Sequence, residues 1–410
     1  MTPVTEIEPA YRWIIIVATA LMLAISMGMM VNGISSFFIP LHDEFGWQRG
    51  DVSLINFSGL IGLAVGGIFM GRLADRTSTR RVCMIGVIVL GLCLVAAGQA
   101  DAVWQFYVLF FIAGFLGAGA LFAPLIANVG AWFKSSVGLA LGIASAGQAL
   151  GQGAVPFGTA VLISEIGWRG ALTTMGFITL GVLIPLAMLI RKSPAQLAAS
   201  AAGGPAEDDE SPVPLPTNTV VIWLSSAVIF CCICMSVPLM HLVPLIQDRG
   251  FPLEDAGSVI LLMMIVAIFG RIVFGKIADM VGALRAYWIA SCWQTVLVFF
   301  FMQIESLTSF YVFVVIYGFG YAGVMTTLLV STSVLTPLSR RASALGIVTL
   351  FGWLGHAIGG YQGGYFFDLT GNYTLTYANA AIAGIINLVI VGSLYTTINR
   401  RKKVALALAE

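Results

Sequence analysis

The sequence carries a charged residue, Arg271, inside a long apolar segment, and this arginine is the side chain best suited to bind a ligand. A charge at the centre of a bilayer costs about 2.5–3.5 kcal/mol on insertion scales, so such a residue indicates a function. The aspartates that could neutralise it, Asp75, Asp279 and Asp368, fall toward the ends of apolar segments. A guanidinium pairs with a carboxylate through two parallel hydrogen bonds, which favours an organic anion as ligand. The alternatives are an arginine that extends toward lipid headgroups or bonds to helix carbonyls.

A single cation favours a ligand with a single negative charge, so the sequence indicates a small monocarboxylate rather than a dicarboxylate or phosphate. Asn32, in another apolar segment, could donate a hydrogen bond to an oxygen of such a ligand. Gln152 is a further polar candidate, and the alternative for it is a hydrogen bond that joins two helices.

Two related halves, offset by 204 positions, make up the chain. Residues 71–76 read Gly-Arg-Leu-Ala-Asp-Arg, and residues 275–279 read Gly-Lys-Ile-Ala-Asp. Likewise, Leu-Gly-Ile at 141–143 returns at 345–347. In so apolar a chain, two parallel copies are typical of a transporter whose halves move about a site between them. Arg271 has a glycine as its repeat partner, so the duplication does not account for it.

His356 stands opposite Gln152 in the repeat. A histidine can change its charge near neutral pH, so His356 is the candidate for coupling transport to protons. The alternative is a neutral histidine with a structural hydrogen bond.

Composition places the protein in a membrane. The chain is 59% hydrophobic and 10% charged, with a mean hydropathy of +0.96, whereas soluble domains carry about 25% charged residues. A bilayer core requires about 20 apolar residues per helix. We therefore expect an all-α membrane protein with twelve transmembrane helices, over residues 12–39, 50–73, 82–99, 104–131, 136–163, 170–190, 219–246, 254–278, 285–303, 308–335, 341–367 and 376–397.

The domain organisation follows from the repeat and from one polar stretch. Residues 1–190 and 219–410 are expected to form two pseudo-symmetric six-helix bundles, joined by a cytoplasmic linker at 191–218 that is rich in proline and acidic residues. All but four of the twenty lysines and arginines fall on the side of the two termini. This asymmetry predicts a multi-pass protein of the plasma (inner) membrane with both termini in the cytoplasm.

Several other classes of function find no support in the sequence. The six cysteines have no zinc or redox spacing, and no phosphate-binding loop or catalytic triad is present. We expect no cofactor, metal or enzymatic activity, and the net charge of +1 does not indicate a nucleic-acid partner. Transport would then be secondary, driven by a proton gradient or by a counter-anion.

The loop at 71–76 resembles the signature loop of the major facilitator superfamily, and the segment at 275–279 resembles its weaker second copy. The resemblance implies twelve helices in two bundles. It also implies a conformational latch at the cytoplasmic ends of the bundles, which would use the residues Gly71, Asp75, Arg76, Arg80, Arg81, Gly275 and Asp279.

A narrower resemblance is to the monocarboxylate transporters and the oxalate–formate exchangers. Arg271 lies four positions before Gly275, as the substrate arginine of these families does. Asn128 and the pair Trp132-Phe133 match a motif of the exchangers. Tyr321-Ala322-Gly323 stands where the exchangers carry Trp-Gly-Gly. The resemblance implies that Tyr321 and Phe122 occupy positions that line the cavity, and the alternative for each is a packing residue.

The sequence also departs from these families. Asn32, Ala267 and Gly352 replace a lysine, an aspartate and a second lysine, respectively. Proton coupling through the first lysine and the aspartate, and binding of a dianion between two cations, therefore do not carry over.

Together these observations predict a secondary active transporter of a lactate- or pyruvate-like anion, working by alternating access with proton coupling. The alternatives are an exchanger of the oxalate–formate type, a multidrug exporter of the same fold, and a receptor that has lost transport. An exporter of cations would need a buried acid, which the sequence does not show.

Overall fold

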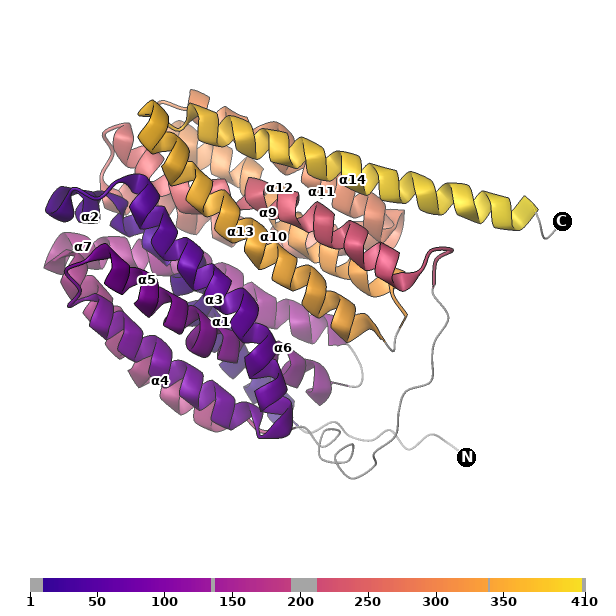
Figure 1. Ribbon diagram of the computed structural model, residues 1–410, viewed down its shortest axis with the longest axis horizontal. Coiled ribbons are helices and arrows are strands. Elements are labelled where there is room, and N and C mark those ends of the chain that lie inside the picture. Colours follow the sequence, from indigo (N-terminus) through magenta and orange to yellow (C-terminus); the bar gives the residue numbers. More distant parts are fainter. Residues whose placement is uncertain (1–9, 134–136, 193–211, 338–339, 408–410) are drawn as a thin grey trace.

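The computed structural model describes residues 10–133, 137–192, 212–337 and 340–407 (Figure 1). In this part of the chain all regular elements are helices. In the first half they are α1 (Tyr11–Val31), η1 (Gly33–Phe37), α2 (Phe38–Phe45), α3 (Arg49–Arg76), α4 (Thr79–Ala97), α5 (Val103–Ile112), η2 (Ala113–Ala118), α6 (Gly119–Trp132) and α7 (Val137–Leu189). In the second half they are α9 (Thr217–Asp248), α10 (Leu253–Val281), α11 (Ala283–Val298), η3 (Phe299–Gln303), α12 (Leu307–Leu335), α13 (Arg341–Thr370) and α14 (Thr374–Ala407).

The helices account for twelve passes through a membrane. Eleven helical stretches of the described chain are long and apolar enough to span a bilayer, and one of them, Ala140–Leu189, has 50 residues. That stretch is two helices, because Gly167 interrupts it with a φ of 73° and a ψ of 167°. The positive φ suits glycine, which lacks the Cβ that makes this region costly. The predicted fold class is confirmed.

The two halves pack in the same way. In the first half α1 lies along the first part of α7, and in the second half α9 lies along α13, which is the repeat equivalent of that pair. Likewise α4 packs on α7 and α11 on α14. The close contact between α1 and α7 requires Gly151, because a Cβ at this residue would lie 1.9 Å from the carbonyl oxygen of Ala24. Most of the predicted linker at 191–218 falls outside the described residues.

The first predicted span, 12–39, is not one helix. α1 ends at Val31, Asn32 adopts a φ of −142°, and a short 3-10 helix leads into α2. The Nδ2 of Asn32 donates to the carbonyl of Gln152 at 2.6 Å. This bond to a residue of α7 stabilises the break within the N-terminal bundle.

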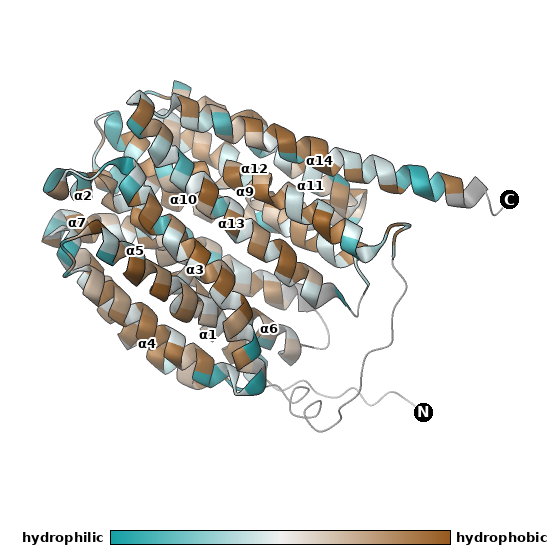
Figure 2. Ribbon diagram, in the orientation of Figure 1, coloured by the Kyte–Doolittle hydropathy of each residue, from teal (hydrophilic) through white to brown (hydrophobic). Residues whose placement is uncertain are grey.

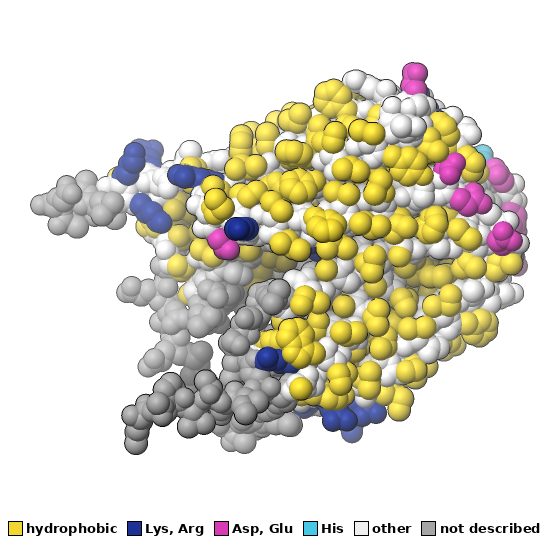
Figure 3. All heavy atoms as spheres, turned by 180° about the vertical axis from the view of Figure 1, so that it is seen from behind, with side chains coloured by type: hydrophobic (Ala, Val, Ile, Leu, Met, Phe, Trp, Pro, Cys, Tyr) yellow, Lys and Arg dark blue, Asp and Glu magenta, His cyan; other side chains and the backbone are white. Residues whose placement is uncertain are grey.

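Hydrophobic residues make up most of the length of the helices, and hydrophilic residues are more frequent near the helix ends (Figure 2). Exposed residues such as Phe177, Ile222 and Phe269 would contact lipid. In the face seen in Figure 3, acidic side chains gather at one end of the molecule and most Lys and Arg side chains at the opposite end, where the termini lie. The distribution agrees with a chain that spans a bilayer with an asymmetric charge.

Candidate functional site

Arg271 lies within α10, 18 residues after its first residue Leu253, which corresponds to about 27 Å along the helix. The side chain is half-buried. Its Nη1 donates to the carbonyl oxygen of Ser145 in α7 at 3.1 Å, so the guanidinium reaches from one bundle to the other. Its Nε is buried and has no hydrogen-bond partner in the described chain. No ion pair of Arg271 is recorded among the described residues.

Tyr321 of α12 is the neighbour of Arg271 that the sequence indicated. Its hydroxyl lies close enough to interact electrostatically with the guanidinium. The ring is 2% exposed and stacks on Tyr317 with 5.8 Å between centroids. This packing fixes the ring and leaves the hydroxyl as a polar group beside Arg271.

Phe122 meets the opposite bundle through a residue that sequence reasoning missed. Its ring contacts Trp353 of α13 edge-on, with 5.5 Å between centroids. Trp353 in turn lies 5.6 Å from the ring of His356. The signal that could have found Trp353 is its spacing of three residues from His356, because positions i and i+3 share a helix face.

His356, Asn32 and Gln152 are all buried. The Nδ1 of His356 lies 3.2 Å from the carbonyl oxygen of Gly352 in its own helix. Asn32 and the Gln152 backbone bind each other, as described above. The structure therefore places Tyr321 near Arg271 and Asn32 in contact with Gln152. It also places Phe122 against Trp353, whose ring contacts that of His356.

The predicted latch residues fall at the end of α3, the start of α4 and the end of α10. Arg76, Arg80, Arg81 and Asp279 are exposed. A Cβ added at Gly71 would meet nothing within 4 Å, and one at Gly275 would meet only Thr326 of its own bundle. The side chain of Asp75 lies outside the described part of the structure. Among the described latch residues no hydrogen bond or ion pair to the other bundle is recorded.

Instead, the bundles are joined at the opposite end by a cluster that we call the Arg49 clasp, made of Arg49, Asp248, Asp368 and Tyr373. The guanidinium of Arg49 binds both carboxylate oxygens of Asp248, at 2.5 and 2.7 Å. Its Nη1 also donates to the hydroxyl of Tyr373 at 2.7 Å. Burial raises the pKa of Tyr373 above its usual range, so the hydroxyl stays protonated. A bidentate arginine–carboxylate pair is among the stronger polar contacts in proteins.

Asp368 completes the clasp at the first turn of α3. Its two carboxylate oxygens accept hydrogen bonds from the backbone N–H groups of Arg49 and Gly50, at 2.9 and 2.6 Å. These are N–H groups that have no partner within the helix, and the helix dipole favours a negative charge there. Gly364 of α13 permits this approach, because a Cβ there would lie 2.3 Å from the carbonyl oxygen of Arg49.

The described hydrogen bonds and ion pairs that join the ends of the two bundles thus lie at the end with the clasp. At the end with the termini Gly142 of α7 and Gly346 of α13, which are repeat partners, are both exposed, and a Cβ at either would meet nothing within 4 Å. Figure 1 shows the ribbons of the two bundles close together near α2 and further apart toward the termini. Arg271 and the Phe122–Trp353 contact lie between these two ends.

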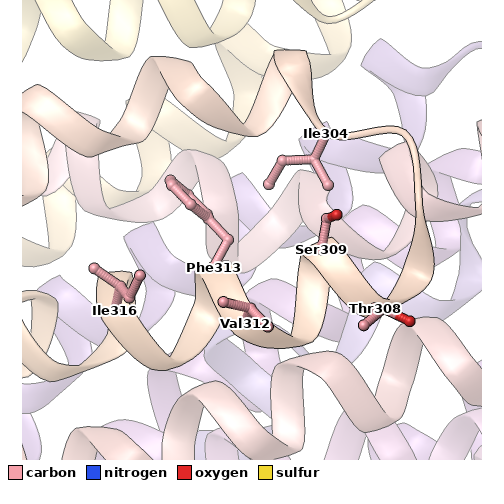
Figure 4. Close-up of a pocket in the computed structure, with 6 residues that line it drawn as sticks. All are labelled: Ile304, Thr308, Ser309, Val312, Phe313 and Ile316. Carbon is pink, nitrogen blue, oxygen red and sulfur yellow. The ribbon is translucent and has the colours of Figure 1, made fainter.

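A hollow of about 280 Å³ in the second half of the chain is lined by residues other than Arg271 and its neighbours (Figure 4). It is lined by Ile304, Thr308, Ser309, Val312, Phe313 and Ile316, and it contains no charged group. A hollow of about 320 Å³ includes the repeat equivalents of five of these residues, Ala100, Trp104, Gln105, Val108 and Leu109. Because Val312 and Trp104 are 59% and 62% exposed, these hollows lie on the lipid-facing surface. We therefore place the candidate site at Arg271.

Two repeat-related helical bundles that span a membrane, meet around a half-buried arginine and close at one end define a membrane transporter. A family model of the Major Facilitator Superfamily matches residues 20–360, and the chain belongs to this superfamily. It is a multi-pass transporter and not an enzyme.

Individual relatives are distant but cover most of the chain. The MFS-type transporter YcxA of Bacillus subtilis is 24% identical over 389 residues, which cover 90% of this chain and 92% of YcxA. Monocarboxylate transporter 13 of Rattus norvegicus is 26% identical over 383 residues, which cover 91% of this chain and 86% of the rat protein. The crystal structure of a D-xylose–proton symporter superimposes with a TM-score of 0.72 at 15% identity, covering 93% of this chain and 97% of the symporter.

Proposed function

We propose that this protein is a secondary active transporter of a small organic monocarboxylate, such as lactate or pyruvate, and that Arg271 binds the carboxylate. The observation that carries the proposal is the hydrogen bonding of the Arg271 guanidinium. It stands between the bundles without an acidic partner in the described chain, with Nε unpaired and with Nη1 bound to a backbone carbonyl alone. A cation in this setting is neutralised when an anion arrives.

The surroundings suit a small ligand with one charge. The Tyr321 hydroxyl can share a carboxylate oxygen with Arg271, and the rings of Phe122 and Trp353 supply an apolar wall. Asn32 and Gln152 are further candidates for hydrogen bonds to the ligand. The similarity to a monocarboxylate transporter of rat supports this substrate class.

The orientation of the chain follows from its charges. The end with the termini carries most of the lysines and arginines and is assigned to the cytoplasm of a plasma membrane. The structure then faces inward, and the Arg49 clasp lies on the external side. The bundles 1–190 and 219–410, joined by the linker 191–218, would rock about Arg271, and the signature-loop residues would latch them in the outward-facing state.

Coupling to protons is assigned to His356, because it lies in the interface helix α13 next to Trp353. A proton on this imidazole would offset the negative charge of the substrate during the inward step. An exchanged anion is the alternative driving force.

The test is counterflow in proteoliposomes with radiolabelled lactate, pyruvate, formate and oxalate. We expect saturable, acid-stimulated flux of the monocarboxylates, which Arg271→Ala abolishes. Arg249→Ala is the matched control, because Arg249 is exposed and donates to the carbonyl of Met302 in its own bundle. Normal lactate and pyruvate flux in a correctly inserted Arg271→Ala protein would refute the site. Flux of oxalate in exchange for formate alone would refute the substrate class.

A further inference from the structure

His241 is a completely buried histidine at the interface of the two bundles, directly beside the Arg49 clasp. It belongs to α9, and its ring lies 5.4 Å from the ring of Phe38 in α2 of the other bundle. On its other side the ring lies 5.2 Å from the ring of Tyr373, a member of the clasp. The imidazole therefore occupies the seam that closes the external side.

The hydrogen bonds of the ring indicate a neutral histidine. The Nε2 of His241 lies 2.8 Å from the carbonyl oxygen of Gly360, so Nε2 carries a hydrogen and donates it. Nδ1 is then the acceptor nitrogen, and it is buried without a hydrogen-bond partner in the described chain. A proton added to Nδ1 would have no acceptor, and a buried charge without a partner is costly.

The charged groups nearby do not compensate such a proton. The cation of the clasp, Arg49, interacts unfavourably with a charged imidazole. Asp248 is bound by the Arg49 guanidinium, and Asp368 is bound by the start of α3. Asp51 of α3 caps its own helix at Gln48.

The other elements at the seam add no acceptor either. In α2, Glu44 pairs with Arg169, Asp43 is exposed, and His42 bonds to the carbonyl of Trp47. Tyr373 accepts the bond from Arg49. In the closed state the described neighbours of His241 therefore accommodate the neutral ring, but they offer no acceptor for the additional proton of an imidazolium.

The fold itself does not demand a histidine here. The repeat partner of His241 is Phe37, which is also completely buried. The second half therefore carries a titratable ring where the first half carries an apolar one of similar size. Gly363 makes room for it, because a Cβ at that glycine would lie 2.2 Å from the Nε2 of His241.

We propose that His241 is a proton-binding site of the external side, neutral while the Arg49 clasp is closed and protonated only when the clasp opens. Opening exposes Nδ1 to external water, which supplies one proton, and closing returns that proton to the same side. Because the proton binds to the open state alone, a lower external pH shifts the population toward that state, by up to tenfold per pH unit. This proposal for His241 rests on the opening and closing of the two bundles and does not depend on which substrate the protein transports.

The experiment measures the separation of the bundles at their external ends without any substrate. Spin labels are placed at Gln99 and Gln303, which are exposed repeat partners in the two bundles, in a Cys292→Ala background. Electron–electron distance distributions are recorded in lipid nanodiscs between pH 8 and pH 5.5. We expect a longer, outward-open component that grows as the pH falls.

His241→Gln keeps a donor for the Gly360 carbonyl but cannot be protonated, and we expect it to abolish the response between pH 8 and pH 5.5. His42→Gln is the matched control and should leave the response intact, because His42 is an exposed histidine that bonds to the Trp47 carbonyl of its own bundle. Asp368→Asn separates the effect of the histidine from that of the carboxylates, since it should raise the open fraction at every pH and preserve the pH-dependent shift. If the His241→Gln protein does not insert into the membrane, His241→Phe is used in its place, because phenylalanine is the residue of the repeat partner Phe37. A wild-type distance that does not change with pH, or a shift that persists in the His241 variant, would overturn the proposal.

Discussion

The guanidinium of Arg271 in α10 donates a hydrogen bond to the carbonyl oxygen of Ser145 in α7, and thereby links the two bundles near the middle of the transporter. A backbone carbonyl carries only a partial charge, so this contact satisfies one donor without neutralising the cation. An arriving carboxylate can compete for the same guanidinium. Binding of the anion and separation of α7 from α10 would then be parts of one event.

Arg271→Lys tests whether the planar fork matters as well as the charge. A lysine keeps the cation but loses the parallel donors, and hydrogen bonds to charged groups contribute about 1.5–3 kcal/mol. We expect KM for lactate to rise at least tenfold, measured by uptake in proteoliposomes. A lysine variant with unchanged KM would contradict bidentate binding.

Trp353→Ala should change the size of the acid that is accepted. Removing the indole takes away the ring that meets Phe122 across the interface, and leaves room for a longer carbon chain. We expect the ratio of uptake rates for pyruvate and a branched 2-oxo acid to shift toward the larger acid. Trp104→Ala is the control, because Trp104 is exposed to lipid in the first bundle. An unchanged ratio would remove Trp353 from the pocket.

Arg49→Leu should open the external side. The variant carries the residue of the repeat partner, Leu253, and removes the bidentate pair with Asp248 and the bond to Tyr373. We expect the outward-open fraction, followed with the Gln99 and Gln303 labels, to increase severalfold at pH 8. The control is Arg169→Leu, since Arg169 makes ion pairs at the same end but with Glu44 and Asp101 of its own bundle. Equal effects of both variants would argue against a clasp between bundles.

His356→Gln should abolish proton-driven accumulation of the substrate without abolishing substrate exchange. If His356 carries the coupled proton, the variant keeps lactate counterflow, which needs no proton gradient, and loses accumulation driven by an acidic exterior. Both are measured in the same proteoliposomes. Retained proton-driven accumulation would exclude His356 from coupling.

The sequence predicted the parts of this structure that rest on local composition and on the repeat. Apolar runs of about 20 residues marked the spans because lipid offers no partner to an unpaired backbone. The offset of 204 positions indicated two matching bundles. Arg271 stood out because a charge in an apolar run is expensive.

The remaining features depend on contacts between distant segments. The break at Asn32 rests on a carbonyl 120 residues away in the chain, so the run 12–39 gave no sign of it. Arg49 is the first residue of α3 and Asp248 is the last residue of α9, and their pairing appears only when the bundles meet. Trp353 resembles any lipid-facing aromatic residue until its contact with Phe122 is known.

Gly364 has a practical consequence for capturing the transporter in its other conformation. Its bare α carbon lies so near α3 that a single added methyl group would sit 2.3 Å from both the Arg49 carbonyl oxygen and the Ser53 hydroxyl. Gly364→Ala would act as a wedge in the seam, with no loss of charge anywhere in the protein. We expect the long Gln99–Gln303 distance to dominate in this variant, which would make it a starting point for imaging the outward-facing form and for raising conformation-specific binders against it.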